Sequence, residues 1–331
     1  MKAKSLQFIL GLVVSLGLLA WLVAALDWNL VLQELVLCNY WALIPGSVLL
    51  VIHFLIRAER WRYLLGGRPE IPSRELVDAI MVGNFANFIL PLRAGEFIRP
   101  YALQARTGVP FATGFASVVT ERFFDLSAVL LTFSLVVSGL PSLPLWASAG
   151  ALSLSILAGA ILIFIGLAVF IPERLQSIAT FFLKILPAKI CDPLSRFVTE
   201  FIAGAAALRN PSNLFRVVLL TGLIWGSCYA LYYSYLLLGD FPLEFKVATT
   251  VSVIIALAVA APSAPGFVGV YQTACLAGFA LFGVPAEKAV SFAIITHVHQ
   301  YVFYVAYGAF VLWRYNMKLS DLAGKRVATN H

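Results

Sequence analysis

The chain has 331 residues, of which 61% are hydrophobic and only 12% are charged. A water-soluble protein of this length needs about a quarter of its residues charged to coat its surface, so lipid must cover most of this protein and a soluble fold is excluded. The net charge of +7 would suit nucleic acid, but the Lys and Arg residues form short clusters between apolar runs. That pattern is typical of membrane loops facing anionic lipid, and we expect no nucleic-acid partner.

Six apolar runs are long enough, at about 20 residues each, to cross a bilayer as helices. They cover residues 5–26, 40–58, 111–139, 147–171, 214–238 and 286–313. Lys and Arg gather before the first run and after the second, fourth and sixth. The positive-inside rule therefore predicts an integral protein of the cytoplasmic (inner) membrane with both termini in the cytoplasm. The basic, amphipathic stretch 172–212 is predicted to be a helical linker on the cytoplasmic leaflet.

Two further stretches, 76–106 and 247–281, begin apolar and break at a centre rich in Pro and Gly. Pro removes a backbone donor and clashes with the preceding helical turn, while Gly permits sharp turns. Irregular backbone at membrane depth is tolerated only where protein or a water-filled cavity satisfies its polar groups. We predict that both stretches are re-entrant or broken helical hairpins, the first entering from the cytoplasm and the second from the opposite face.

The two hairpins also share a sequence pattern. Each contains Pro-x-x-x-Gly, at 91–95 and 265–269, and each is followed by Gly-Val-Pro before a long apolar run. The alternative is chance recurrence of Gly and Pro, but the matched order favours an inverted-topology repeat, with units at approximately 40–139 and 214–313 within one membrane domain, 1–331. The predicted fold class is an all-α polytopic membrane protein with about six full spans and two broken hairpins.

Charged residues inside the third apolar run form the first candidate site: Glu121, Arg122 and Asp125. Glu121 lies about 16 Å along its helix, near the bilayer centre, where a charge costs at least about 2.5–3.5 kcal/mol. Arg122 and Asp125 are spaced to pair, which leaves a net negative cluster unless Arg93 or Arg99 joins it. These residues indicate either a substrate-binding site or a structural salt bridge that locks the hairpin to the span.

Polar residues beside the first helix break are further candidates for substrate binding: Asn84, Asn87, Arg93 and Glu96. Arg93 is placed to grip a phosphate, helped by the positive end of a half-helix that starts nearby. The alternative is that these arginines snorkel to ordinary lipid headgroups, which is the interpretation favoured for Arg99.

Other basic residues lie in the second and sixth runs. His53, Arg57 and Arg60 form one stripe and are interpreted mainly as topology anchors. His297 is a candidate substrate-binding residue or proton carrier, because His titrates near neutral pH; the alternative is a histidine hydrogen-bonded within the helix bundle. The sequence holds no catalytic signature and no metal-spaced His/Cys cluster. We therefore expect a protein that is not an enzyme and that takes neither a cofactor nor a metal.

Three motifs resemble a known family. They are GNFANFILPLRAGEFIRPYAL from Gly83, VVTERFFDLSAVLL from Val118 and APSAPGFVGVYQ from Ala261. In this order they are similar to the transmembrane, flippase-like domain of lysylphosphatidylglycerol synthases, a family that includes many stand-alone membrane proteins. Its two-part members are thought to move an aminoacylated lipid made by a cytoplasmic acyltransferase domain. The chain stops shortly after the sixth run and is expected to be a stand-alone member without that domain. Gln272 departs from the glutamate that the resemblance implies near this position.

The resemblance and the buried charges together lead us to expect a lipid translocator. It would move a phospholipid or other anionic or aminoacylated lipid between leaflets, with Arg93 or Arg122 holding the phosphate and the nearby carboxylates balancing charge. A separately encoded lipid-modifying enzyme is an expected partner. The alternatives are a membrane scaffold or accessory subunit of an envelope lipid or glycan biosynthesis enzyme, and a proton-coupled carrier that uses the histidines.

Overall fold

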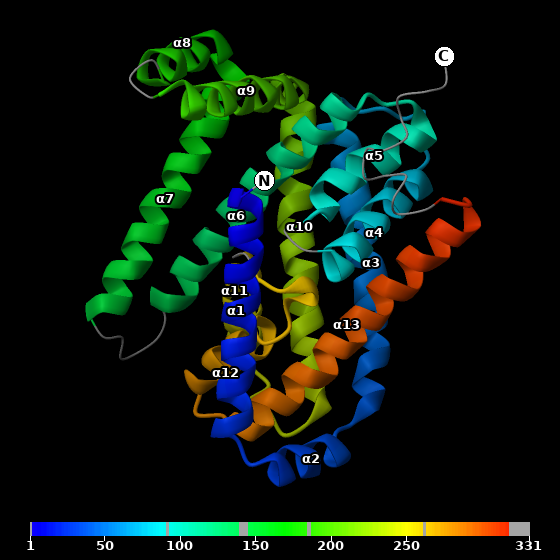
Figure 1. Ribbon diagram of the computed structural model, residues 1–331, viewed down its shortest axis with the longest axis vertical. Helices are drawn as coiled ribbons and strands as arrows, with labels where there is room; N and C mark the ends of the chain where they lie inside the picture. The colour runs from blue at the N-terminus through cyan, green and yellow to red at the C-terminus, as the bar shows by residue number, and fades with distance from the viewer. Residues whose placement is uncertain (1, 91–92, 139–144, 184–186, 261–262, 318–331) are drawn as a thin grey trace. The chain divides into compact units, whose positions relative to one another are not determined.

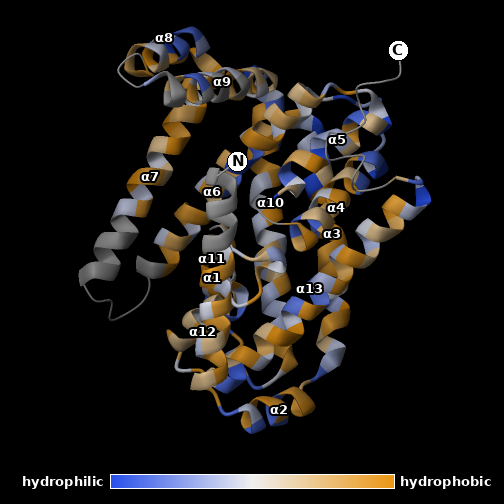
Figure 2. Ribbon diagram, in the orientation of Figure 1, coloured by the Kyte–Doolittle hydropathy of each residue, from blue (hydrophilic) through white to orange (hydrophobic). Residues whose placement is uncertain are grey.

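The computed structural model describes residues 2–90, 93–138, 145–183, 187–260 and 263–317, and every regular element in these ranges is a helix (Figure 1). Among them, four helical segments are long and apolar enough to cross a membrane. These are Tyr40–Leu64, Ser153–Phe170, Pro211–Leu238 and Ala286–Arg314. In Figure 2 hydrophilic colours gather around α5 (Gly95–Thr107), while α8 (Pro172–Leu183) shows both hydrophilic and hydrophobic residues. The chain is thus an all-α polytopic membrane protein, as the composition predicts.

The first and third predicted spans differ from plain apolar helices. The first run forms α1 (Lys2–Ala25), but the chain then bends by 91° into the short helix α2 (Trp28–Leu37), and only the two together pass as one span. The third run forms α6 (Phe111–Ser138), whose length suits a crossing but which carries three charged residues in its middle. The number of crossings therefore stays a prediction.

The chain folds into two compact units, each assembled from separate stretches of sequence. Unit 1 comprises Met1–Phe54, Ile80–Ile98 and Trp225–His331, and unit 2 comprises Leu55–Ala79 and Arg99–Ile224. Four helices contribute residues to both units: α3 (Leu43–Leu64), α4 (Ser73–Ile89), α5 and α10 (Pro211–Tyr235).

Unit 1 contains α1, α2 and most of the C-terminal half of the chain. Its other elements are η1 (Tyr40–Ala42), η3 (Leu236–Leu238), α11 (Phe245–Ala260), η4 (Pro265–Phe267), α12 (Val270–Ala280) and α13 (Ala286–Arg314). Helix α12 packs against α1, α11 and α13. Buried aromatic rings form part of this core, with the rings of Phe279 and Phe292 4.9 Å apart. Edge-to-face rings of this kind stabilise a core beyond the area that they bury.

Both predicted hairpins are helices interrupted by a break. Helix α4 ends at Ile89 and α5 begins at Gly95; α11 ends at Ala260 and α12 begins at Val270. In the second break, Gly266 and Gly269 have φ of 69° and 84°, in the left-handed region that glycine adopts without strain. Parts of the breaks, residues 91–92 and 261–262, lie outside the described residues. The helix–break–helix prediction is confirmed for the described parts, while entry from opposite membrane faces stays a prediction.

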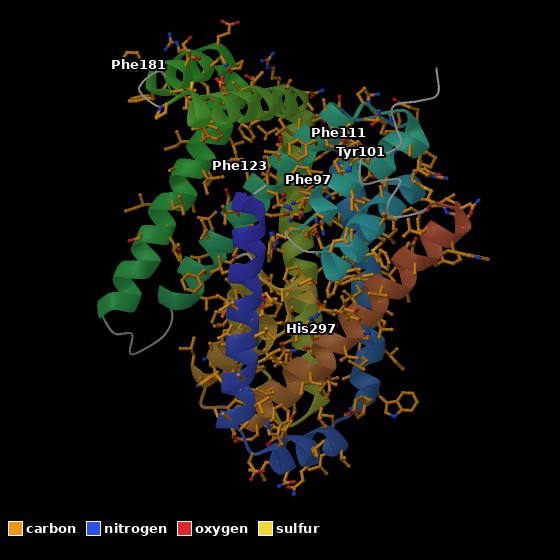
Figure 3. All side chains as sticks on the ribbon, viewed as in Figure 1. Phe97, Tyr101, Phe111, Phe123, Phe181 and His297 are labelled. Carbon is orange, nitrogen blue, oxygen red and sulfur yellow. The ribbon has the colours of Figure 1, made fainter. Side chains whose placement is uncertain are left out.

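Unit 2 is built around α6. Helices α7 (Leu145–Phe170) and α9 (Ala188–Ala205) pack against α6, and α8 lies beside α9 (Figure 1). The ring of Phe201 on α9 lies 4.5 Å from that of Phe123 on α6 and 4.9 Å from that of Phe164 on α7. At the start of α6, Phe111 stacks on Tyr101 of α5 with the ring centroids 4.1 Å apart (Figure 3). These contacts hold α5, α7 and α9 against the charged helix.

The predicted linker 172–212 is helical, in α8, α9 and the short η2 (Ala206–Arg209). Its position on the cytoplasmic leaflet stays a prediction. One face of α9 is covered by α6 itself, because Gly204 brings the two backbones together. A Cβ at Gly204 would lie 2.6 Å from the carbonyl oxygen of Ala116, closer than side chains approach backbone.

We expect Gly204→Ala to destabilise unit 2, because the added methyl must push α9 away from α6. Overpacking of this kind costs about 1–3 kcal/mol, and thermal unfolding of the purified protein in detergent micelles would show a lower midpoint. Gly222→Ala in α10 is the matched control, since a Cβ there meets nothing within 4 Å. Equal unfolding temperatures for the two variants would contradict the close contact of α9 with α6.

Candidate functional site

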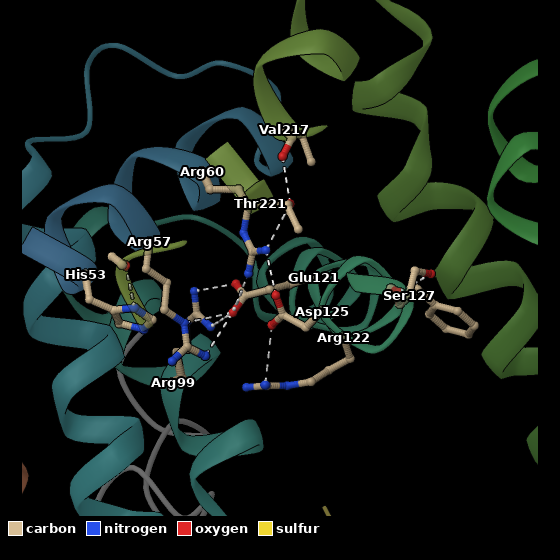
Figure 4. A network of polar contacts seen from close by, with 12 residues as sticks. His53, Arg57, Arg60, Arg99, Glu121, Arg122, Asp125, Ser127, Val217 and Thr221 are labelled. Carbon is tan, nitrogen blue, oxygen red and sulfur yellow. Dashed lines mark hydrogen bonds and ion pairs between the residues drawn. The ribbon is translucent and has the colours of Figure 1, made fainter. Parts of the chain in front are cut away.

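The candidate site is a cluster of charged side chains in unit 2, shown in Figure 4. Helix α6 supplies Glu121 and Asp125, which are four residues apart and therefore share one face. Helix α3 supplies Arg57 and Arg60, which by their spacing of three also share a face, and α5 supplies Arg99. Three helices thus meet at one group of ionic side chains.

Glu121 is the centre of the cluster and is completely buried. Its Oε1 accepts hydrogen bonds from Arg57 Nε at 3.0 Å and Arg57 Nη2 at 2.9 Å. Arg99 donates to both oxygens, Nη1 to Oε1 at 3.0 Å and Nη2 to Oε2 at 2.9 Å. A third guanidinium approaches from Arg60, whose Nη2 lies 3.4 Å from Oε1. The bidentate contact with Arg99 is the geometry in which a guanidinium binds a carboxylate most strongly.

Asp125 forms the second centre, one helical turn further along α6. Its Oδ1 accepts a hydrogen bond from Arg60 Nη1 at 2.6 Å, and Arg122 Nη1 lies 3.6 Å from Oδ2. Arg60 Nη1 also donates to Thr221 Oγ1 on α10, at 3.1 Å. Arg60 therefore links both carboxylates and a third helix, although its side chain is fully buried.

The burial of the arginines divides the cluster into an inner and an outer part. The side chains of Arg60 and Arg99 are 0% and 3% exposed, whereas those of Arg57 and Arg122 are 13% and 39% exposed. The guanidinium of Arg99 is further held 3.8 Å above the ring of Trp61, a cation–π contact that desolvation strengthens. Trp61 is itself fixed by a hydrogen bond from Nε1 to Ser117 Oγ at 2.8 Å.

The arginines of the cluster are donors of many N–H groups. Four guanidinium groups, on Arg57, Arg60, Arg99 and Arg122, contact the carboxylates of Glu121 and Asp125. In the part of the chain that the structure describes, Arg60 Nε and Arg99 Nε are buried and have no hydrogen-bond acceptor. Buried donors usually have a partner, so these two N–H groups call for an acceptor that the described residues do not supply.

These contacts settle several predictions from the sequence. The predicted pairing of Arg122 with Asp125 is confirmed, and Arg99 is the arginine that joins Glu121. The interpretation of Arg57 and Arg60 as topology anchors is wrong, because both contact the carboxylates of α6. Arg99 is likewise buried in the cluster, so its interpretation as an arginine reaching for lipid headgroups is also wrong. These arginines lie inside or beside apolar runs of the sequence, where a charged side chain needs a partner. That position was the signal from which their place in the cluster could have been predicted.

Arg93 takes part in a different arrangement, in unit 1. Its Nη2 donates a hydrogen bond to the carbonyl oxygen of Val259, at 2.8 Å, in the last turn of α11. Its guanidinium also lies 5.8 Å from the ring centre of Phe267, in the second break. A cation at a helix C-terminus satisfies an unpaired carbonyl and the negative end of the helix dipole. Arg93 therefore connects the two breaks, and its predicted contact with a phosphate stays a prediction.

The other predicted residues of the first break also lie in unit 1. Asn87 Oδ1 accepts a hydrogen bond from the backbone N–H of Gly95, at 2.8 Å, and so caps the first turn of α5. Asn84 and Glu96 are half-buried on the helices that flank the break. None of these contacts by itself assigns a substrate.

His297 is buried in unit 1, where it stacks on Tyr271 at 4.5 Å. Its Nδ1 is 3.0 Å from Nε2 of Gln272, while Gln272 Oε1 accepts from the backbone N–H of Gly269 at 2.8 Å. Gln272 therefore ties the second break to α13 in the place where the resemblance implies a glutamate. The interpretation of His297 as a hydrogen-bonded bundle histidine is supported by these contacts. His299 has separate partners, Ser47 and Tyr235.

Within the described ranges, no three His, Cys, Asp or Glu side chains are grouped so that they could hold a metal ion. The chemistry available at the arginine cluster is electrostatic. Its guanidinium groups can bind the oxygens of an anion, and its carboxylates are already hydrogen-bonded to arginines.

Comparisons with known proteins agree with the membrane fold. Residues 8–308 match the family described as the lysylphosphatidylglycerol synthase TM region. A UPF0104 membrane protein of Methanothermobacter thermautotrophicus is 25% identical over 81% of this chain and 82% of its own length. No solved structure matches.

A second relative is a larger enzyme. Glycosyltransferase AglD of Haloferax volcanii is 29% identical over 141 residues, which are 41% of this chain. The matched part spans only 22% of that relative's length. The similarity is therefore to a part of AglD.

We expect Glu121→Gln to be much less stable than Arg122→Gln. Neutralising Glu121 leaves three arginine contacts without their anion, and breaking a buried ion pair costs about 3–5 kcal/mol. The side chain of Arg122 is 39% exposed, so its guanidinium is partly solvated and its removal should cost less than the loss of Glu121. Denaturant unfolding of each purified variant in the same detergent measures the difference, and similar losses for both would show that Glu121 is not the centre of the cluster.

Proposed function

The chain belongs to the family of the lysylphosphatidylglycerol synthase transmembrane region, and from that premise we propose that it is a lipid translocator. It moves a phospholipid or other anionic or aminoacylated lipid between the two leaflets and is not an enzyme. The observation that carries the proposal is the arginine–carboxylate cluster on α6, a helix that we take to cross the membrane. Ionic groups at membrane depth are expensive and typically mark the path of a substrate or an ion.

The arrangement of the broken helices supports the same function. Both breaks lie in unit 1, where Arg93 on one side contacts Val259 and Phe267 on the other. Discontinuous helices that meet in this way are a known design of secondary transporters, in which inverted repeats alternate between two access states. The proposal includes such a repeat, with units at approximately 40–139 and 214–313.

The proposed location is the cytoplasmic (inner) membrane with both termini on the cytoplasmic side. The basic residues before the first span and after the second, fourth and sixth support this orientation, because cytoplasmic loops retain Lys and Arg. The lipid would then be supplied or consumed by a separately encoded lipid-modifying enzyme, with which the protein would act as a partner.

We expect the purified protein, reconstituted in liposomes, to speed the movement of lipids between leaflets. Phosphatidylglycerol, phosphatidylcholine and lysylphosphatidylglycerol would each carry a fluorophore on the acyl chain, so that the headgroup stays native. Loss of fluorescence after adding a membrane-impermeant quencher measures the lipid in the outer leaflet. Arg122→Gln should slow the movement at least about tenfold, equivalent to about 1.4 kcal/mol in the barrier, because it removes an outer arginine from the cluster.

Arg174→Gln is the matched control for this experiment. Arg174 is an exposed arginine of α8, in the same unit, so the change removes one positive charge at a distance in sequence from the cluster. Its rate should equal that of the unaltered protein. If folded protein moves none of the three lipids faster than empty liposomes do, the translocator proposal is wrong.

The similarity to part of glycosyltransferase AglD favours one alternative. In that case the chain is a membrane scaffold or accessory subunit of an envelope lipid or glycan biosynthesis enzyme, and the charged cluster only stabilises the fold. In that case neither the unaltered protein nor Arg122→Gln moves lipid faster than empty liposomes do. The enzyme partner then binds surfaces other than the charged cluster.

A further inference from the structure

We propose that Arg93 and Phe267 form a clasp that couples the two helix breaks of unit 1, and that this clasp opens during lipid movement. Each residue is the third of its Pro-x-x-x-Gly frame, 91–95 in the first break and 265–269 in the second. The coupling of the breaks stands on contacts within unit 1, while its use in transport rests on the proposed function.

The backbone of the two residues is the first argument. Arg93 has φ of 53° and Phe267 has φ of 59°, so both adopt the left-handed conformation. In the ranges that the structure describes, the one other non-glycine residue with positive φ is Asn316, and asparagine adopts this region more readily than most residues. A bulky residue keeps such a conformation only where surrounding contacts hold it, and such positions gather at switch regions. The third residue of each frame thus has the same unusual backbone.

The contacts of the two residues are the second argument, because they are reciprocal. The guanidinium of Arg93 lies 5.8 Å from the ring centre of Phe267, and Arg93 Nη2 donates to the carbonyl oxygen of Val259, 2.8 Å away in the last turn of α11. In turn, the ring of Phe267 packs edge-to-face on that of Phe88, 5.6 Å away in the last turn of α4. Each residue therefore contacts its counterpart and the helix end that precedes its counterpart.

The glycine that ends each frame is the third argument. The backbone N–H of Gly95 donates to Asn87 Oδ1 and that of Gly269 donates to Gln272 Oε1, both at 2.8 Å. A Cβ on either glycine would collide with the carbonyl oxygen of another helix. These contacts anchor α5 and α12 at their first turns. A rearrangement of either break therefore involves the left-handed residue two positions before the glycine.

This pair has one role in transport. Secondary transporters with broken helices alternate between access states by moving one group of helices against another. A cation–π contact and one hydrogen bond are weak enough to open and re-form in each cycle, and together they favour the arrangement in which the two breaks are joined. Arg93 and Phe267 are therefore positioning residues, which set how readily the two breaks separate.

The test is hydrogen–deuterium exchange of the full chain in detergent micelles, measured by mass spectrometry on peptides that contain each break. Arg93→Asn and Phe267→Asn each remove one partner of the clasp but supply a residue that the left-handed backbone accepts. Each variant should raise the exchange rate at least about threefold in both breaks, because loss of the contact frees the two breaks together. A rise limited to the break that carries the substitution would overturn the inference.

Three further variants make the test specific. The double variant should exchange no faster than either single variant, since one change already removes the clasp, whereas multiplied effects would show independent residues and overturn the inference. Arg93→Lys keeps a cation for the ring of Phe267 and should restore most of the protection; exchange as fast as in Arg93→Asn would also count against the clasp. Arg314→Asn is the matched control and should leave both breaks unchanged. Arg314 is an exposed arginine at the end of α13, and its guanidinium lies 5.4 Å from the ring centre of Tyr315.

Exchange and transport are measured separately, so their failures are distinguishable. In the liposome experiment, Arg93→Asn and Phe267→Asn should each speed lipid movement at least about threefold, because the joined arrangement is left more readily. Unchanged movement in both variants would overturn the role of the clasp in transport. Coupled exchange without lipid movement by the unaltered protein would support the coupling of the breaks and contradict the translocator proposal. Lipid movement together with exchange confined to single breaks would do the reverse.

Discussion

Unit 2 depends on the contacts between the buried carboxylate of Glu121 and the arginines around it. It is bonded to arginines from α3 and α5, and Asp125 one turn away extends the network through Arg60 to α10. Neither carboxylate nor guanidinium is tolerated alone in a poorly solvated interior, because the cost of removing a charge from water is recovered only by a close partner. The charges thus fix which helices must meet, while the aromatic contacts of α9 with α6 and α7 complete the packing.

The inner and outer residues of this network differ in how far they are buried. Its inner residues are buried and closely bonded, with Arg99 held between Glu121 and Trp61. Its outer residues, Arg57 and Arg122, are partly exposed at the edge of the network, and guanidinium groups are donors for the oxygens of an anion.

Unit 1 meets a related constraint in its backbone. Breaks in a membrane helix expose N–H and C=O groups, and each must find a partner within the protein. Asn87 accepts from Gly95, Ser15 accepts from Ala264 N–H, and Arg93 donates to Val259. Gln272 completes the pattern by binding Gly269 and His297 together. Polar side chains from neighbouring helices therefore make the irregular segments compatible with an apolar surrounding.

Much of the fold follows from the sequence alone. Composition and the apolar runs determine an all-helical membrane protein, because a chain with so few charges has no other way to satisfy its backbone in lipid. The Pro and Gly residues determine where the helices break, since these constraints act on the local backbone. The pairing of Arg122 with Asp125 was also accessible, because residues three apart on a helix are neighbours.

Only the tertiary structure decided the composition of the candidate site. Arg57 and Arg60 lie more than sixty residues before Glu121 in sequence, and Arg99 lies on a separate helix beyond the first break. Local spacing says which residues share a helical face but not which faces meet, so the sequence could not say which arginines join the carboxylates. The sequence by itself determined that buried charges on α6 needed partners; the packing of α3 and α5 against α6 decided that Arg57, Arg60 and Arg99 supply them.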